Sequence, residues 1–597
     1  MKPAPRRWQV SDTAPLPGHP PLLAQLLAAR GHDATAARAL LDGSAAFHEP
    51  LGLKGMGAAV AVLGDAIRGG ERIAIYGDYD ADGVTACAML SRALRGAGVD
   101  VVPYIPNRMN EGYGLHSAAL ADLHEKGVTC VVTVDCGTSS VDVAAGRPAG
   151  MRLVVTDHHL PLAPDGAPPA LAPADALINP KQPGCEYAYD GLAGAGVAWK
   201  LLAALEAAGL VPDGSAAAGL GLAALGTVAD MMPLTGENRL IVQRGLPLLR
   251  ELAGVRALCQ AAGLPLSLRA SDIGFGIGPR INAAGRMEDA RLALDLCLSD
   301  DEENALGLAL QLDTQNRARQ QAVAVAMAEA EAMVAELPED APAIVLGSPG
   351  WPMGIVGLVA GRLTERYARP SLIVCLDPGE AKGSARSIPA VHIVEALDGS
   401  ASTLIRYGGH RVAAGFSLQA ARFDEFAQSV RASVARQLGA APRERVIVVD
   451  GEITAADCVP ATCDILELLE PCGQGNTPPV LAMRDCAVLS TSTFGAESQH
   501  ARVVLADDSG LVEATAFFKP GLADHLPRGR RVDVCVGLER DEWQGQVRVR
   551  ARLRDIRPAQ PRAVIEVTGR PVPVTAGVAV SHTLDIDDAR VLPPTGG

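Results

Sequence analysis

Short apolar runs that each end in acidic or histidine residues constrain the fold of this chain more than any other feature. ERIAIYG is followed by DYDADG at residues 78–83, VTCVVTVDCG contains Asp135 at its end, and MRLVVTDHH ends at residues 157–159. Between the first two runs, VTACAMLSRALRGAG places apolar residues on one helical face. Strands that alternate with helices predict a mostly parallel sheet covered on both faces. The carboxyl ends of such strands meet at one crevice, so we expect these polar side chains to surround it.

Changes of pattern divide the 597 residues, a length typical of about four domains, into six segments. Residues 299–337 contain no proline and only one glycine, which predicts a long connecting helix; the alternative is a packed helix that breaks near Gly307. Several short strands with Gly/Asp turns late in the chain predict a closed all-β barrel such as an OB-fold. The predicted segments are an N-terminal helical segment (1–70), an α/β domain (71–298), the long helix (299–337), a second α/β domain (338–440), the barrel (445–557) and a tail (558–597).

Composition excludes several classes of protein. The 53 basic and 68 acidic residues give a net charge of −15, which rules out a uniformly basic nucleic-acid binder but leaves room for a local basic groove. No apolar run of about 18 residues is present, so we expect no transmembrane helix, and MKPAPRRWQV is not followed by the apolar region of a secretory signal. The twelve sparse cysteines are typical of reduced, mostly buried thiols in a cytoplasmic protein.

The carboxylates expected at the crevice require cations. GTVADMMPL adds Asp230 after another apolar run, and two unit charges about 4 Å apart repel by roughly 4 kcal/mol at an effective dielectric constant of 20. Two divalent ions would offset four carboxylates. Oxygen ligands with one or two histidines favour Mn²⁺ or Mg²⁺, whereas the lack of thiolates argues against structural zinc. Such ions fit phosphoester hydrolysis; the alternative for any one motif alone is a solvated turn or a structural histidine.

These residues also carry a family resemblance. GDYDADG, TVDCG, DHH and GTVADMMPL resemble the successive motifs of the DHH phosphoesterase superfamily. NRMNEGYGL (107–115), GPRINAAGR (278–286), GSARSI (383–388) and GGHRVAAG (408–415) are similar to motifs of its RecJ family of single-strand-specific 5′→3′ DNA exonucleases. EPCGQGNTPP (470–479) resembles the signature at the entry to that family's OB domain, with Cys472 in place of a bulkier apolar residue. The resemblance covers residues 70–557 and implies a DHH domain, a DHHA1 domain and an OB-fold in that order.

The resemblance assigns roles to individual residues. It implies metal ligation by Asp80, Asp82, Asp135, His158 and Asp230, with Asp135 as the bridge between two ions. Catalytic roles fall to Asp82, Asp135 and His159, of which the last contacts the scissile phosphate or its water; the role of Asp78 stays open. Residues near the substrate phosphates are Arg108, Arg280, Asn282, Ser384, Arg386, Gly408, Gly409 and His410. Glycines allow close backbone approach to a phosphate, and arginine forks match its oxygens.

A basic strand offers a second nucleic-acid contact. VRVRARLR places Arg548, Arg550, Arg552 and Arg554 on one face of a strand, which in an OB-type barrel could track a phosphate backbone. The alternative is a solvated outer face. Base stacking could involve Phe494, Phe517, Phe518 or Trp543, although aromatic residues in strands usually belong to the core. The cysteines of this region contain no CxxC pair, which argues against zinc.

The sequence therefore predicts a metal-dependent exonuclease that hydrolyses single-stranded DNA to 5′-mononucleotides, in DNA repair and recombination. The 5′→3′ polarity is implied by the resemblance alone. The alternatives are a phosphodiesterase for short oligonucleotides or cyclic dinucleotides, which would leave the barrel without a role, and a non-catalytic single-strand-binding scaffold, against which the intact ligand set argues. A monomer is the simplest expectation, with a helicase and a single-strand-binding protein as candidate partners. The metal used in the cell and activity on RNA stay open.

Overall fold

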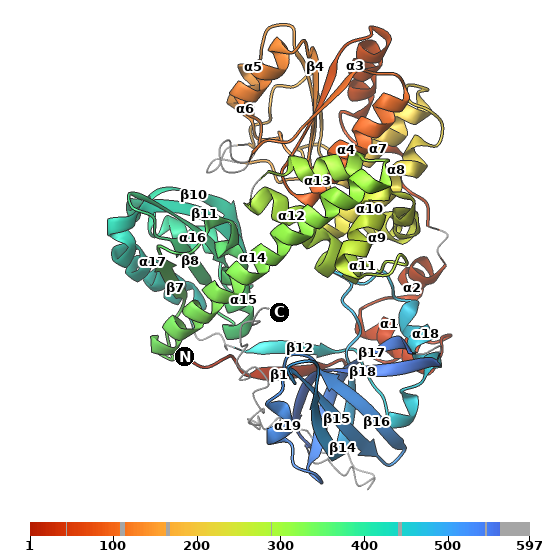
Figure 1. Cartoon of the computed structure of the whole chain (residues 1–597), viewed down its shortest axis with the longest axis vertical. Coiled ribbons are helices and arrows are strands. Elements are labelled where there is room, and N and C mark those ends of the chain that lie inside the picture. Colours follow the sequence, from red (N-terminus) through yellow and green to blue (C-terminus); the bar gives the residue numbers. More distant parts are fainter. Residues whose placement is uncertain are drawn as a thin grey trace. The chain divides into compact units, whose positions relative to one another are not determined.

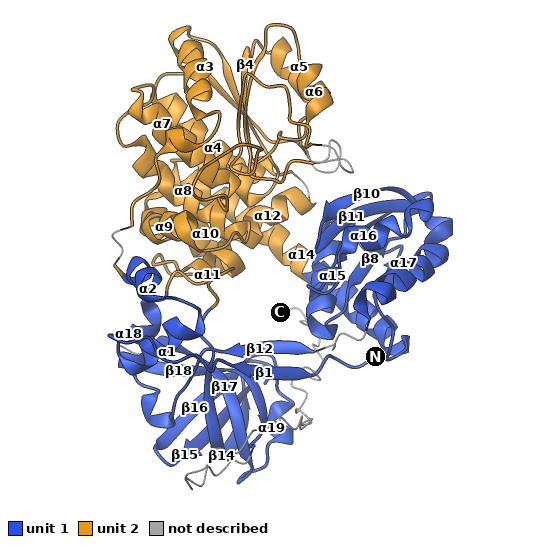
Figure 2. Ribbon diagram, turned by 180° about the vertical axis from the view of Figure 1, so that it is seen from behind, with its two compact units in different colours: residues 1–41, 321–469, 478–597 blue, residues 42–320, 470–477 orange. Residues whose placement is uncertain are grey.

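The computed structural model describes residues 1–42, 45–107, 114–162, 168–287, 289–439, 444–543 and 546–560. The chain forms two compact units, which Figure 2 colours separately. Unit 2 comprises residues 42–320 and 470–477, and unit 1 comprises residues 1–41, 321–469 and 478–597. Among the residues described, every helix falls short of the length or the apolar character that a bilayer-spanning helix needs. All twelve cysteines lie in the described part of the chain; none forms a disulfide, and ten are buried.

A five-stranded parallel sheet forms the centre of unit 2 and confirms the predicted α/β fold (Figure 1). Its strand order is β3 (Val101–Tyr104), β2 (Ile73–Gly77), β4 (Cys130–Val134), β5 (Arg152–Thr156) and β6 (Ala176–Ile178). Alternate residues of the strands point to opposite faces, so Ile73 and Ile75 join one core while Ala74 and Tyr76 join another. The first core includes α3 (Met56–Arg68), α4 (Ala81–Gly96) and α7 (Gly194–Ala207); the second includes α5 (Ser117–Glu125) and α6 (Val141–Ala145).

Helices complete unit 2. They are α8 (Ser215–Ala229), α9 (Gly236–Gly245), α10 (Ala253–Ala262), α11 (Ala270–Asp272), α12 (Gly278–Met287) and α13 (Arg291–Leu298). The hydrophobic α8 packs against α4 and α7, which places its carboxyl end, with Asp230, beside the carboxyl edge of the sheet. The predicted long helix is confirmed as α14 (Glu302–Glu336), which Gly307 does not interrupt. This helix begins in unit 2 and ends in unit 1.

A second five-stranded sheet lies in unit 1, where the sequence predicts the DHHA1 domain. Its order is β10 (Leu404–His410), β11 (Ala413–Gln419), β9 (Glu380–Arg386), β8 (Ser371–Cys375) and β7 (Ile344–Ser348). Only the β7–β8 pair is parallel. One face of β7 and β8 packs against the end of α14 and against α15 (Met353–Tyr367). The other face is covered by α16 (Ile393–Asp398) and α17 (Phe423–Leu438).

The predicted barrel is also confirmed. Its strands are β14 (Leu481–Phe494), β15 (His500–Asp507), β16 (Gly510–Ala516), β17 (Arg531–Trp543) and β18 (Gln546–Pro558), and the short β13 (Gly451–Glu452) pairs with β14 outside the barrel. Strand β14 pairs with both β15 and β17, and this second pairing closes a five-stranded barrel of the OB type. Two short helices accompany it, α18 (Pro460–Glu467) and α19 (Leu522–His525).

The N-terminal segment differs from the helical prediction for residues 1–70. It contains the helices α1 (Pro21–Ala29) and α2 (Ala34–Leu41) as well as α3, which belongs to the core of unit 2, but RRWQV forms a strand, β1 (Arg6–Val10), parallel to β12 (Arg445–Val449). The buried Trp8 indole N–H donates to Asp555 Oδ2 at 2.6 Å, and Arg6 pairs with the same carboxylate at 2.9 Å. These partners lie more than 500 residues away in sequence, so no local pattern could have indicated the strand.

Candidate active site

The loop after β2 is shaped by its own carboxylates. Asp80 is the N-cap of α4, and its Oδ1 accepts hydrogen bonds from the backbone N–H groups of Asp82 (2.9 Å) and Gly83 (3.2 Å). The Asn282 side-chain oxygen accepts another from the Ala81 N–H at 2.8 Å. DYDADG is therefore a capped helix start at the carboxyl end of the strand, and it turns Asp82 into the protein interior.

Asp82 is completely buried and faces the first turn of α7. Its two carboxylate oxygens accept hydrogen bonds from the N–H groups of Gly194 (2.7 Å) and Ala195 (2.9 Å). Burial, followed by the charge of Asp80, raises the pKa of Asp82 to about 7, and the two backbone hydrogen bonds only partly oppose this rise. The carboxylate is thus held in position at an electrostatic cost that a bound cation would offset.

Asp135 follows β4 and adopts a left-handed backbone conformation with φ 63°. Burial, and then the charge of Asp82, raise the pKa of Asp135 well above its usual value. A Cβ added at Gly194 would lie 2.5 Å from Asp135 Oδ1. Helix α7 must therefore begin with glycine to approach both carboxylates. The sequence patterns did not indicate this requirement, although the glycines of the run LAGAGVA (192–198) stand at the start of the helix. A Cβ at Gly226 of α8 would likewise lie 2.6 Å from an Asp82 oxygen.

His158 connects three of the predicted carboxylate ligands at the carboxyl edge of the sheet. Its Nε2 lies 3.1 Å from Asp135 Oδ1, 3.6 Å from Asp230 Oδ2 and 3.9 Å from Asp82 Oδ2. Burial, and then the charge of His159, lower the pKa of His158 to about 3, so the ring is neutral. Neutral imidazole is the form that ligates metal ions.

Polar atoms without partners indicate that cations belong in this site. In the described part of the chain, neither ring nitrogen of His158 nor Oδ1 of Asp135 has a hydrogen-bond partner, and the 3.1 Å pair is not aligned for one. Buried polar groups are otherwise almost always satisfied. Three sets of side chains have ligand atoms within 4.8 Å of one another: Asp82–His158–Asp230, Asp78–Asp80–Asp135 and Asp135–His158–His159. The carboxylate-rich donors fit Mn²⁺ or Mg²⁺. Asp135 and His158 each belong to two of the sets, and the bridging role of Asp135 stays a prediction.

His159 differs electrostatically from His158. Its Nδ1 lies 2.8 Å from Asp157 Oδ1, and Asp157 also accepts from the backbone N–H groups of Thr138 (2.9 Å) and His158 (2.7 Å). Burial disfavours the charged ring, but the hydrogen bond to Asp157 and that residue's charge outweigh it and raise the pKa of His159. Asp157 therefore orients the His159 ring and favours its protonated form, whereas the surroundings of His158, a predicted ligand, favour the neutral form.

Residues 470–477, which the sequence predicts at the entry to the barrel, lie in unit 2 against the loop that follows Asp230. The Leu234 N–H donates to the Gln474 carbonyl at 2.7 Å. The buried guanidinium of Arg239 donates to a backbone carbonyl of the same segment at 2.6 Å. This segment therefore supports the loop of a predicted metal ligand, which the sequence did not indicate.

The predicted phosphate-contacting residues of unit 2 have structural partners. Arg280 pairs with Asp313 at 2.8 Å and donates to the Gly276 carbonyl at 2.8 Å. Asn282 accepts from the loop backbone, as described above. Arg108 lies outside the described residues. Phosphate contacts by Arg280 and Asn282 stay predictions, and the structure adds that these side chains brace α12 against its neighbours.

The remaining predicted phosphate contacts lie on the DHHA1 sheet. Cross-strand pairing places Ser384, Arg386, Gly408 and His410 on one face, whereas Gly409 alternates to the other. Gly409 has φ 151°, and a Cβ there would lie 2.4 Å from the Ala413 carbonyl oxygen, so only glycine fits. Arg386 donates to Ser384 Oγ at 3.1 Å and to a backbone carbonyl, and burial lowers the pKa of its guanidinium. The partners of Arg386 are neutral, so its positive charge is available to pair with an anion such as a phosphate.

On the barrel, the predicted arginines Arg550 and Arg552 have carboxylate partners on the neighbouring strand. Arg550 pairs with Asp541 at 2.5 Å, and Arg552 pairs with Glu539 at 3.5 Å. The Arg552 guanidinium also lies over the Phe517 ring, 5.4 Å from its centroid. Cross-strand pairs of this kind fit the solvated-face alternative for the arginine strand, while Arg548 and Arg554 are exposed. Phosphate binding by the four arginines therefore stays a prediction.

Aromatic side chains gather at one end of the barrel strands. Phe494, Phe517 and Phe518 surround His500, whose ring centroid lies 5.1, 5.1 and 4.7 Å from theirs. Arg502 lies over the Phe494 ring at 5.2 Å, and Phe518 is 65% exposed. The side chain of Trp543 lies outside the described residues. The sequence suggested the phenylalanines but missed His500, which lies at their centre.

Comparisons with known proteins agree with the order of these domains. Family models match residues 72–227 (DHH family, N-terminal domain), 340–436 (DHHA1 domain) and 449–555 (RecJ OB domain). The chain is 35% identical to the single-stranded-DNA-specific exonuclease RecJ of Bacillus subtilis, over 90% of this chain and 68% of that protein. It is also 35% identical to the protein of the same name from Dickeya dadantii, over 93% of this chain and 99% of that protein.

Solved structures show the same similarity. The crystal structure of RecJ from Thermus thermophilus in complex with Mn²⁺ matches with a TM-score of 0.77 and 32% identity, over 96% of this chain and 81% of that chain. The structure of that protein in complex with Mg²⁺ gives a TM-score of 0.72 and 31% identity, over 94% and 79% of the two chains. The sequence motifs, the three domains in order and the coverage of nearly the whole length agree. The chain therefore belongs to the RecJ family.

Proposed function

We propose that the protein is a metal-dependent exonuclease that hydrolyses single-stranded DNA to 5′-mononucleotides. The observation that carries this proposal is the convergence of Asp82, Asp135, His158 and Asp230, with buried ligand atoms that lack partners in the described part of the chain. Its relatives are single-stranded-DNA-specific exonucleases. The 5′→3′ polarity rests on the family resemblance.

Each group of the site has a separable role in this reaction. Asp80, Asp82, Asp135, His158 and Asp230 would hold Mn²⁺ or Mg²⁺, ions that activate water and stabilise the charge that develops on phosphorus. His159 donates a charge-assisted hydrogen bond to a phosphate oxygen, because Asp157 fixes the ring and favours its protonated form. The N–H groups at the start of α7 keep Asp82 from rotating away.

The barrel supports a single strand as substrate. Its aromatic cluster of Phe494, His500, Phe517 and Phe518 offers ring faces on which unpaired bases stack, and stacking tolerates any base sequence. This role excludes the duplex, whose bases are already stacked. It also gives the barrel a use that the dinucleotide phosphodiesterase alternative lacks. A helicase that exposes single strands, a single-strand-binding protein, a monomeric state and a cytoplasmic location complete the proposal.

Release of label from a 5′-labelled single strand tests the proposed function. We expect Mn²⁺- or Mg²⁺-dependent release of mononucleotides that stops with a chelator, and a matched duplex should be resistant. Label released only from dinucleotides would favour the short-oligonucleotide alternative. Tight, salt-sensitive binding without cleavage would favour the scaffold. A 3′-labelled strand, which should yield its label last, tests the polarity.

Alanine at Phe518 should weaken strand binding without affecting the chemistry of the metal site. Loss of one stacking face costs about 1–3 kcal/mol, or roughly 5- to 150-fold in affinity. The measurement is fluorescence anisotropy with a labelled single strand and Ca²⁺ in place of Mn²⁺. Leu511→Ala removes a similarly exposed apolar side chain from β16 and serves as the control. Equal effects of the two variants would argue against stacking.

A further inference from the structure

One face of the DHHA1 sheet carries a row of polar residues beyond those predicted to contact phosphate. Residues that pair directly across β10, β11 and β9 share a face of the sheet. The three successive rows on this face are His410–Ala413–Arg386, Gly408–Gly415–Ser384 and Arg406–Ser417–Lys382. The first two rows contain the predicted phosphate-contacting residues. The third holds two cations and a hydroxyl, and the proposed function does not use it.

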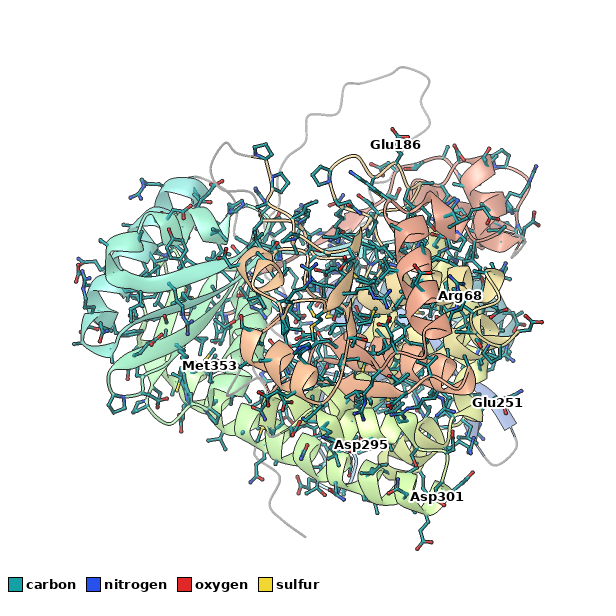
Figure 3. The ribbon with its side chains drawn as sticks, turned by 90° about the horizontal axis from the view of Figure 1, so that it is seen from above. Arg68, Glu186, Glu251, Asp295, Asp301 and Met353 are labelled. Carbon is teal, nitrogen blue, oxygen red and sulfur yellow. The ribbon has the colours of Figure 1, made fainter. Side chains whose placement is uncertain are left out.

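A cavity of about 240 Å³ opens at the third row. Its lining includes Lys382, Arg406 and Ser417, together with Met353, which begins α15 and is labelled in Figure 3. Ser417 is 2% exposed, and its Oγ has no hydrogen-bond partner among the residues that the structure describes. An unsatisfied buried hydroxyl is unfavourable. It therefore points to a polar group of a ligand in this cavity.

The charges of the row suit an anion. The side chain of Arg406 is 72% exposed, and it pairs with the exposed carboxylate of Glu380 at 3.7 Å. An exposed ion pair of this length contributes little to stability, so a phosphate can replace the carboxylate. Next to the row, a Cβ at Gly408 or Gly415 would meet nothing within 4 Å. The sheet is therefore flat and open between the third row and the predicted contacts Ser384 and Arg386.

We propose that Arg406, Ser417 and Lys382 bind a second phosphate of the substrate strand, beside the phosphate expected on Ser384 and Arg386. Adjacent rows on one face are about 6.8 Å apart, two residues along a strand, which is comparable to the distance between successive phosphates of an extended single strand. The inference rests on the proposed function, because an exonuclease acting on a single strand has successive phosphates of that strand to bind. The second phosphate is either internucleotide or an additional phosphate at the 5′ end.

The test compares full-length Lys382→Gln and Arg406→Gln with the parent protein. We expect KM for a twenty-residue oligothymidylate to rise about tenfold in each variant, as for loss of a charged hydrogen bond, with kcat unchanged. The slope of log Kd against log salt, measured by anisotropy with Ca²⁺, should fall by about 0.7 for the lost phosphate contact. Arg422→Gln removes an exposed, ion-paired arginine of the same domain and should have no effect. Glu380→Gln should lower KM, since Arg406 loses its competing partner.

Three forms of the oligothymidylate identify the phosphate: 5′-hydroxyl, 5′-monophosphate and 5′-triphosphate. The same KM change on all three indicates an internucleotide phosphate, and a change that grows with terminal phosphates indicates the 5′ end. The proposal is overturned if both variants stay within twofold of the parent on all three substrates, or if Arg422→Gln has the same effect. Absence of cleavage by the parent would instead refute the proposed function, and the Ca²⁺ binding measurement would still test the row.

Discussion

Replacement of Asp135 with asparagine is expected to lower kcat by roughly 10³-fold or more, with strand binding nearly unchanged. Asp135 belongs to two of the three potential ligand sets, so its loss removes a ligand from both of those sets. Asparagine keeps the shape of the side chain and offers only a neutral oxygen. Cleavage of an end-labelled strand with Mn²⁺, and anisotropy with Ca²⁺, measure the two quantities. Wild-type turnover by the variant would show that the metal site lies elsewhere.

The same variant should raise the melting temperature of the metal-free protein. Burial, and then the charge of Asp82, disfavour the ionised Asp135, and asparagine has no charge to bury. We expect a gain of roughly 2–4 °C for each kcal/mol of repulsion removed. Asp142→Asn, on the exposed side of α6, is the control. An unchanged melting temperature would show that the carboxylates do not destabilise the metal-free protein.

The raised pKa of Asp82 gives the pH dependence of the metal-free wild type a contribution of definite sign. The folded-state pKa of Asp82 is raised from its usual 3.8 to about 7, so between these values the folded chain keeps a proton that the unfolded chain loses. The stability that Asp82 contributes below pH 4 is therefore lost as the pH rises through 7, whereas the lowered pKa of His158 makes a contribution of the opposite sign between about pH 3 and 6.5. Mn²⁺ should reduce this loss, because the ion stabilises the charged carboxylates. Thermal unfolding between pH 4 and 8, with chelator and with Mn²⁺, provides the comparison.

Residues at strand ends could be predicted from sequence because a parallel sheet brings its carboxyl ends together whatever the loops between them do. Asp82, Asp135 and His158 follow three strands that are neighbours in the sheet, and they meet as expected. The barrel was predictable for a similar reason, since its strands follow one another in sequence. In each case a local pattern determines where a residue lies.

Contacts between distant segments could not be predicted in this way. Strand β1 pairs with β12 and its Trp8 donates to Asp555, and the loop after Asp230 is supported by residues 470–477. Ser417 lies between Lys382 and Arg406 because these residues pair with it from the two neighbouring strands. Only the register of the sheet shows that the three side chains are adjacent. Spacing along the chain carries no information on such pairs, because each depends on how complete elements pack.

Gly194→Ala should lower cleavage roughly 100-fold, the second large effect expected at this site. Alanine is the better helix former, so propensity alone predicts a small gain in stability at the start of α7. The added Cβ, however, would lie 2.5 Å from Asp135 Oδ1 and 2.6 Å from its Cβ. Either Asp135 or the N–H groups that hold Asp82 must move, and a displacement of about 1 Å at a catalytic group costs on the order of 10²-fold.

Gly196→Ala in the same helix separates this clash from a general effect of alanine. The Cβ added at Gly196 would meet Leu192 and Ile241 side chains at 3.4 Å or more, which is ordinary contact, so this variant should cleave like the wild type. Activity should be measured as a function of Mn²⁺ concentration. Gly194→Ala alone should need a 10- to 100-fold higher Mn²⁺ concentration for half-maximal activity, as for loss of a group that orients a ligand. If the two variants needed the same Mn²⁺ concentration for activity, α7 would only support the fold. A role for α7 in positioning the carboxylates requires that the Mn²⁺ concentration needed for activity change in Gly194→Ala and not in Gly196→Ala.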